Sequence, residues 1–151
     1  MVAWVLTGCA IRQEVKPVER MESRQICVIE DKTVRASFLE SYKKALANKG
    51  YYVRQLQPLA ALTACPVTST YSAAWIWDFA PWLDYAEILV YHNGKLAGEA
   101  RYDARSADAN WRRYQAADSK IRALAYQLFP NRLATPAPPE STPAQADDDP
   151  D

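Results

Sequence analysis

One histidine and three acids are the side chains of this sequence that could carry out acid–base catalysis. His92 is the only histidine among 151 residues, and no serine or cysteine is placed to act as its nucleophile. Asp78, Asp84 and Glu87 could form the carboxylate pair of a hydrolase, but acids beside a turn are usually solvated. The four glycines form no phosphate-binding loop, and the sequence has no CxxC motif or histidine cluster. We therefore predict no catalytic residue, no metal site and no cofactor, and a hydrolase is the least favoured hypothesis.

Cys9 ends the segment Leu-Thr-Gly-Cys at 6–9, which has the form of a lipobox. In that motif small residues allow a peptidase to reach the backbone, and the cysteine thiol accepts a diacylglycerol. The match is similar to the signal of bacterial lipoproteins, and it predicts that Cys9 is lipidated as the first residue of the mature protein. Ala10 follows Cys9, and by resemblance to the Gram-negative sorting rule the absence of Asp there indicates the outer membrane.

The segment before Cys9 is shorter than a working export signal, which has a basic start and about 7–15 apolar residues. Here no Lys or Arg precedes the cysteine, and the apolar run spans only Val2 to Leu6. We interpret residues 1–9 as a truncated lipoprotein signal. Either the true translation start lies upstream of Met1 or the segment was trimmed. The alternative is an unmodified cysteine near a frayed terminus.

Cys27 and Cys65 remain once Cys9 is set aside as a lipid site, and they can pair in only one way. Cys27 lies in the apolar run 26–29, and Cys65 lies next to Pro66 in a connection. An oxidising periplasm would allow them to form a disulfide, which by loop entropy would stabilise the fold by about 4 kcal/mol. We favour this disulfide over the alternative of two reduced, buried cysteines.

The most aromatic stretch runs from Trp75 to Trp82. Trp75 and Trp77 occupy alternate positions of a predicted strand, so their side chains lie on the same face. They belong to the core if helices cover that side, and to a binding surface if they do not. Trp82 follows Pro81 in a predicted turn, so we expect it to be the more exposed residue, able to anchor a partner or touch lipid headgroups. Trp75, Trp77 and Trp82 are therefore the candidate partner-binding residues.

The composition is that of a folded domain. Apolar residues make up 49% and charged residues 24%, which supplies a core and excludes wholesale disorder. No apolar run approaches the roughly 20 residues of a membrane-spanning helix. The 18 basic and 18 acidic residues balance, which argues against a nucleic-acid partner. Five of the acids and no base lie in residues 133–151, so residues 1–132 carry 18 basic against 13 acidic residues.

The chain divides into a central domain and two polar flanks. Residues 10–24 are polar and contain Pro17, and we interpret them as a tether between lipid and domain. Residues 133–151 are rich in proline and acid, with almost no bulky apolar residue, so we predict a disordered acidic tail there. The folded domain is then 25–132.

Periodicity predicts the elements of this domain. A helix with one apolar stripe follows the first strand, and Gly50 is placed to end it. Asn93 and Gly94 predict a tight hairpin, because both residues accept positive φ. A second amphipathic helix runs from Trp111 to Phe129 before Pro130, and residues 80–84 form a turn. The predicted strands are 24–30, 51–56, 70–79, 85–92 and 95–102.

These elements predict an α+β fold. A strand, a helix and a strand of such lengths indicate a crossover between parallel strands. Each helix has a single apolar stripe, so both helices should cover the same face of the sheet. We expect a two-layer sandwich with a mixed sheet of four to five strands and two helices on one face, in the order β-α-β-β-β-β-α or a close variant.

Four segments carry a resemblance to a known family: Leu-Thr-Gly-Cys at 6–9, Ile-Cys-Val-Ile-Glu-Asp at 26–31, Cys-Pro at 65–66 and Tyr-Ser-Ala-Ala-Trp-Ile-Trp-Asp at 71–78. Over about residues 6–130 the chain resembles a family of small, uncharacterised proteobacterial envelope lipoproteins. The resemblance implies export, lipidation and no assigned enzymatic activity.

The leading functional hypothesis is a lipid-anchored lipoprotein of the outer membrane, with its domain in the periplasm. It would act as a non-catalytic binding or scaffolding module, with the membrane and an envelope protein as partners. The alternative is an auxiliary subunit of an envelope transport or assembly complex, docked through the tryptophan-rich strand or a free sheet edge. An envelope hydrolase is the third hypothesis. The sequence does not determine the oligomeric state.

Overall fold

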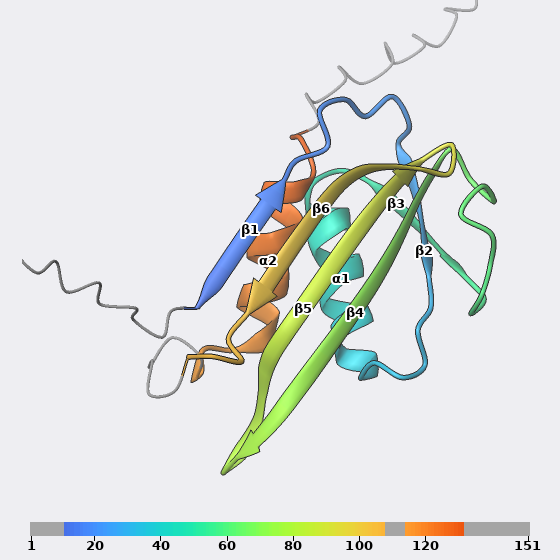
Figure 1. The fold of residues 1–151 in the computed structure, drawn as a ribbon. Coiled ribbons are helices and arrows are strands. Elements are labelled where there is room, and N and C mark those ends of the chain that lie inside the picture. The colour runs from blue at the N-terminus through green and yellow to red at the C-terminus, as the bar shows by residue number, and fades with distance from the viewer. Residues whose placement is uncertain (1–10, 108–113, 132–151) are drawn as a thin grey trace, which may run out of the picture.

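The computed structural model describes residues 11–107 and 114–131 of the chain. These residues form six strands and two helices (Figure 1), and neither helix is long and apolar enough to span a bilayer. In chain order the elements are β1 (Arg12–Lys16), β2 (Gln25–Ile29), α1 (Ala36–Asn48), β3 (Tyr52–Leu56), β4 (Val67–Asp78), β5 (Ala80–His92), β6 (Lys95–Asp103) and α2 (Ala117–Leu128).

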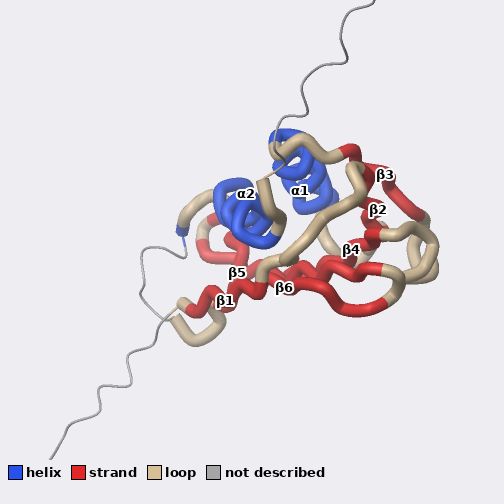
Figure 2. Tube along the Cα trace, turned by 90° about the horizontal axis from the view of Figure 1, so that it is seen from above, coloured by secondary structure: helices blue, strands red, loops and turns tan. Residues whose placement is uncertain are grey.

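The strands form one mixed sheet in the order β1-β6-β5-β4-β2-β3. β2 is parallel to both β3 and β4, and the remaining neighbours are antiparallel. Both helices lie on the same side of the sheet (Figure 2). The predicted α+β class with a mixed sheet and two helices on one face is confirmed, and the strand number is six rather than four to five.

The additional strand is β1, which lies inside the segment interpreted as a tether. It pairs antiparallel with β6, from Arg12 beside Asp103 to Lys16 beside Glu99. Four of its five residues are exposed and most are charged, which is typical of an edge strand protected against further pairing. Val18 is buried just beyond it. The tether interpretation is therefore wrong for this stretch, and the folded domain begins well before residue 25.

Three other predictions fall partly or wholly outside the described residues. The truncated signal (1–9) and the acidic tail (133–151) lie there entirely. Of the last predicted helix, residues 111–113 lie there, and the described helix α2 begins at Ala117. It ends at Leu128, shortly before Pro130, as predicted.

The core fills the space between the helices and the inner face of the sheet. Phe38 of α1 stacks on Tyr71 of β4, with ring centroids 5.1 Å apart. The hydroxyl groups of Tyr42 and Ser69 lie 2.8 Å apart in a buried hydrogen bond, and burial raises the pKa of Tyr42. Because side chains alternate along a strand, Ser69, Tyr71 and Trp75 all belong to the face of β4 that the helices cover.

A lysine joins the ends of the two helices. Lys49 follows α1 directly, and its Nζ donates to the carbonyl oxygen of Tyr126 at 2.6 Å and also to that of Phe129. The Tyr126 carbonyl belongs to the last turn of α2 and the Phe129 carbonyl to the residue that follows it, where the helix has no further backbone donors to offer them. Burial lowers the pKa of Lys49. Gly50, at φ 90°, then ends α1 in the predicted left-handed conformation.

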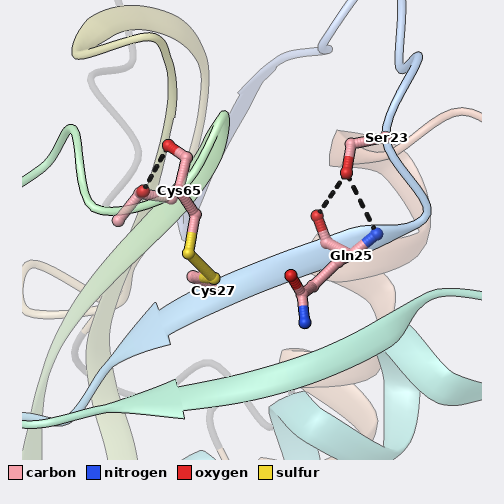
Figure 3. Close-up of a disulfide and its surroundings, with 5 residues drawn as sticks. Ser23, Gln25, Cys27 and Cys65 are labelled. Carbon is pink, nitrogen blue, oxygen red and sulfur yellow. Dashed lines mark hydrogen bonds between the residues drawn. A yellow bond between two sulfur atoms is a disulfide. The ribbon is translucent and has the colours of Figure 1, made fainter.

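Cys27 and Cys65 form the predicted disulfide (Figure 3), with their Cα atoms 6.2 Å apart. Cys27 is fully buried on β2, on the face turned away from the helices. Cys65 lies in the connection between β3 and β4, and its carbonyl oxygen accepts a hydrogen bond from the Thr68 hydroxyl. The disulfide therefore fastens this long connection to β2, the strand next to the β3 edge of the sheet.

We predict that removing the disulfide weakens the fold without changing it. The bond links residues 38 positions apart, and in the loop-entropy model such a crosslink stabilises by about 4 kcal/mol. A Cys27→Ala/Cys65→Ala double variant should lower the free energy of unfolding in urea by about 2–4 kcal/mol. A reducing agent should destabilise the unaltered chain similarly and leave the double variant unaffected. Equal urea midpoints for the two proteins would contradict this prediction.

Candidate interaction surface

The β4–β5 hairpin extends past its neighbours in the sheet (Figure 1). β2 pairs with β4 at Thr68 and Ser69, and β6 pairs with β5 only as far as Tyr85, which faces Ala74. Within the described residues, the hairpin beyond Ala74 and Tyr85 is paired only with itself. Asp78 pairs with Ala80, so the two strands meet at a turn that contains only residue 79.

The two most exposed aromatic side chains of the described residues lie at this tip. Phe79 occupies the turn with φ 55° and is 99% exposed, and Trp77 is 78% exposed. A positive φ at a phenylalanine is strained, since its Cβ meets the neighbouring backbone. Two neighbouring bulky apolar side chains in water are unfavourable, so we take the tip, residues 77–81, as the candidate interaction surface.

The three predicted tryptophans have different environments. Trp75 is half-buried, with its ring edge-on to Phe38 at 6.3 Å and the Arg35 guanidinium 5.6 Å from its centroid. It therefore packs against the margin of the core. Trp77 lies on the same face, two residues nearer the tip, where it is exposed. Trp82 is half-buried, and its Nε1 donates to the carbonyl oxygen of Asp78 at 2.8 Å.

The expectation that Trp82 is more exposed than its neighbours is wrong, because residues 80–84 form a strand rather than a turn. β5 begins at Ala80, and a β-bulge between the Ala74–Tyr85 and Trp75–Leu83 pairs absorbs one extra residue. The bulge keeps the hairpin paired as far as its tip, which places Trp82 inside the ladder and moves the exposure to Trp77 and Phe79.

Two side chains from the α2 end of the chain hold the hairpin in place. The Tyr114 hydroxyl donates to Asp78 Oδ2 at 2.7 Å, and its ring packs edge-on to Trp82 at 5.4 Å. Lys120 is buried, with Nζ 3.5 Å from the Leu83 carbonyl oxygen, and it also lies over the ring of Tyr102. These contacts could not be predicted from the sequence, because they join segments more than thirty residues apart.

The side chains considered for catalysis are dispersed. His92 is exposed at one end of β5, and Asp78 lies near the other end of the same hairpin. Glu87 accepts a hydrogen bond from Arg101 Nη2 at 2.7 Å, and Asp84 is buried. In the part of the chain that the structure describes, no three His, Cys, Asp or Glu side chains are grouped to hold a metal ion.

A hollow of about 420 Å³ lies where the parallel strands β2 and β3 end. Its walls include Ile29, Pro58 and Leu59, and Asp31 donates its backbone N–H to the Tyr71 hydroxyl at 3.0 Å beside it. Burial raises the pKa of Tyr71, and the nearby carboxylates add to this effect. No motif in the sequence indicates this hollow, although the carboxyl ends of neighbouring parallel strands lie at the same edge of a sheet, where ligands commonly bind. Its lining is suited to a small, mainly apolar group.

We predict that Trp75 contributes to stability and Trp77 does not. Trp75→Ala removes contacts with Phe38 and Arg35 and should lower the free energy of unfolding by about 2 kcal/mol. Trp77→Ala removes an exposed ring from the same strand face and should change this free energy by less than about 0.5 kcal/mol. Urea unfolding of the two variants tests the difference, and equal losses would show that the assigned environments are wrong.

No protein-family model and no curated protein sequence matches the chain. Among solved structures, the chain is similar to the PelC dodecamer from Paraburkholderia phytofirmans, with a TM-score of 0.50 and 14% identity over 77% of this chain and 92% of the PelC chain. A single-residue variant of the same PelC dodecamer gives a TM-score of 0.49 and 15% identity, over 77% and 90% of the two chains. At these identities the likeness concerns the fold alone.

Proposed function

We propose that the protein is a lipid-anchored module of the bacterial cell envelope that works by binding or scaffolding rather than by catalysis. The Cys27–Cys65 disulfide is the observation that carries this proposal. Disulfides persist in oxidising compartments such as the periplasm. This bond uses the two cysteines other than Cys9, which ends the lipobox and is the thiol available for lipidation.

The position of β1 brings the domain close to its anchor. β1 begins at Arg12, three residues after Cys9. The folded domain therefore follows the lipidated residue almost directly, without a tether of fifteen residues between them. A single acyl chain gives only marginal membrane binding, whereas several chains on one cysteine give a lasting hold. Such an anchor would keep the domain in the periplasm, at the inner surface of the outer membrane.

Labelling with radioactive palmitate in the native bacterium, with the gene at its own locus, tests the anchor. We expect label in the unaltered protein and its recovery in the outer-membrane fraction. Cys9→Ser should abolish both. The Cys27→Ala/Cys65→Ala double variant is the matched control, since it also removes thiols but keeps Cys9 and should remain labelled. Equal fractionation of the Cys9→Ser protein and the unaltered protein would refute the anchor.

A subunit of an envelope assembly built from several copies is the second candidate. The PelC chains of similar fold are dodecamers, and this sheet has an outer face that neither described helix covers (Figure 2). Light scattering on the purified chain of 17.0 kDa, over a range of concentrations, tests this candidate. A closed oligomer of fixed mass would support it. A monomer at all concentrations would exclude self-assembly and leave the lipid-anchored module standing.

A further inference from the structure

The start of β1 and the tip of the β4–β5 hairpin lie at the same end of the sheet (Figure 1). One row of paired residues crosses four strands here: Arg12 faces Asp103, Asp103 faces Tyr85, and Tyr85 faces Ala74. Because these neighbours are antiparallel, β1 and β4 run in opposite directions. Following the chain backwards from Arg12 towards Cys9, and forwards from Ala74 to the hairpin tip, therefore leads off the same end of the sheet.

The hairpin reaches farther from this row than Cys9 can. Cys9 precedes Arg12 by three residues, which span at most about 11 Å when fully extended. Residues 75–79 continue from Ala74 to the tip, and five extended residues span roughly 16 Å. Cys9 lies within about 11 Å of Arg12, so a hairpin directed at a bilayer that holds Cys9 is long enough to reach into the lipid.

The side chains at the tip suit the membrane interface. Phe79 and Trp77 are its exposed aromatic side chains, and tryptophan in particular is enriched where the headgroups meet the acyl chains. The one carboxylate between them, on Asp78, accepts a hydrogen bond from Tyr114, so this acid already has a partner as it approaches lipid. Pro81, also exposed, adds apolar surface without a backbone donor.

We propose that the hairpin tip, residues 77–81, inserts into the same leaflet that holds the lipidated Cys9, which gives the domain two points of attachment. This inference rests on the proposed anchoring through Cys9. A bilayer accounts for the position of the tip beside the anchor, whereas a protein partner could be met from any side of the domain. Attachment at two points fixes the orientation of the sheet relative to the membrane, which attachment at a single point does not.

Quenching of tryptophan fluorescence by brominated lipids tests the insertion. The lipidated full chain is reconstituted into vesicles of phosphatidylethanolamine and phosphatidylglycerol whose acyl chains carry bromine near the headgroups. We expect quenching, and we expect Trp77→Phe to remove a large part of it, because this change deletes the reporter and keeps an apolar ring. Unchanged quenching in the Trp77→Phe protein overturns the insertion.

Partitioning of the unacylated chain measures the contribution of the tip alone. In a Cys9→Ser background, Trp77→Ser/Phe79→Ser should weaken partitioning into the same vesicles at least about tenfold, since two aromatic side chains no longer enter lipid. Leu96→Ser is the matched control, because Leu96 is 55% exposed at the opposite end of the sheet. It should leave partitioning unchanged. Equal partitioning of the double variant and its parent overturns the inference.

The outcomes separate this inference from the anchoring on which it rests. Acylated Cys9 with unquenched Trp77 overturns the insertion and leaves the anchor intact. Quenched Trp77 in a chain that carries no acyl group supports the insertion and refutes the anchor. A photoreactive residue placed at Phe79 should crosslink to lipid in native membranes. Crosslinking to an envelope protein instead overturns the insertion and assigns the tip to a protein partner.

Discussion

Two short helices that pack on a longer sheet set the constraint on which the rest of this structure depends. α1 has 13 residues and α2 has 12, so each is roughly 20 Å long, whereas the 12 residues of β4 extend about 40 Å. The core can therefore form over only about half of β4, where Phe38 stacks on Tyr71. Past Trp75 the strand continues beyond this core, and Trp77 is exposed to solvent.

This mismatch makes the uncovered part of the hairpin dependent on a few contacts. A two-stranded hairpin without further strands or a covering helix is marginally stable in water. Here Trp75 anchors its base to α1, and Tyr114 holds Asp78 and Trp82 nearer the tip. An ordered aromatic side chain loses less entropy on binding than a mobile one, so these contacts would favour the proposed insertion of the tip.

Features coded by neighbouring residues could be predicted from the sequence, and those set by distant segments could not. The turn at Asn93 and Gly94 follows from the positive φ that both residues adopt, and the disulfide followed from cysteine number and context. β1 was missed because four of its five residues are polar, so the sequence shows no alternation of apolar and polar residues there. Only Val15 is partly buried. The exposure of Trp77 depends on how far the helices extend along the sheet and on the β-bulge. Neither feature can be recognised from the residues close to Trp77 in the sequence.

The edge position of β1 has a mechanical consequence. Its five residues pair with β6 in one antiparallel ladder, and the chain enters this strand at the end nearest Cys9. A pull on that end along the strand axis would load the hydrogen bonds of the ladder together, in shear, rather than one after another. The ladder between β1 and β6 would therefore resist a pull on the chain that precedes β1.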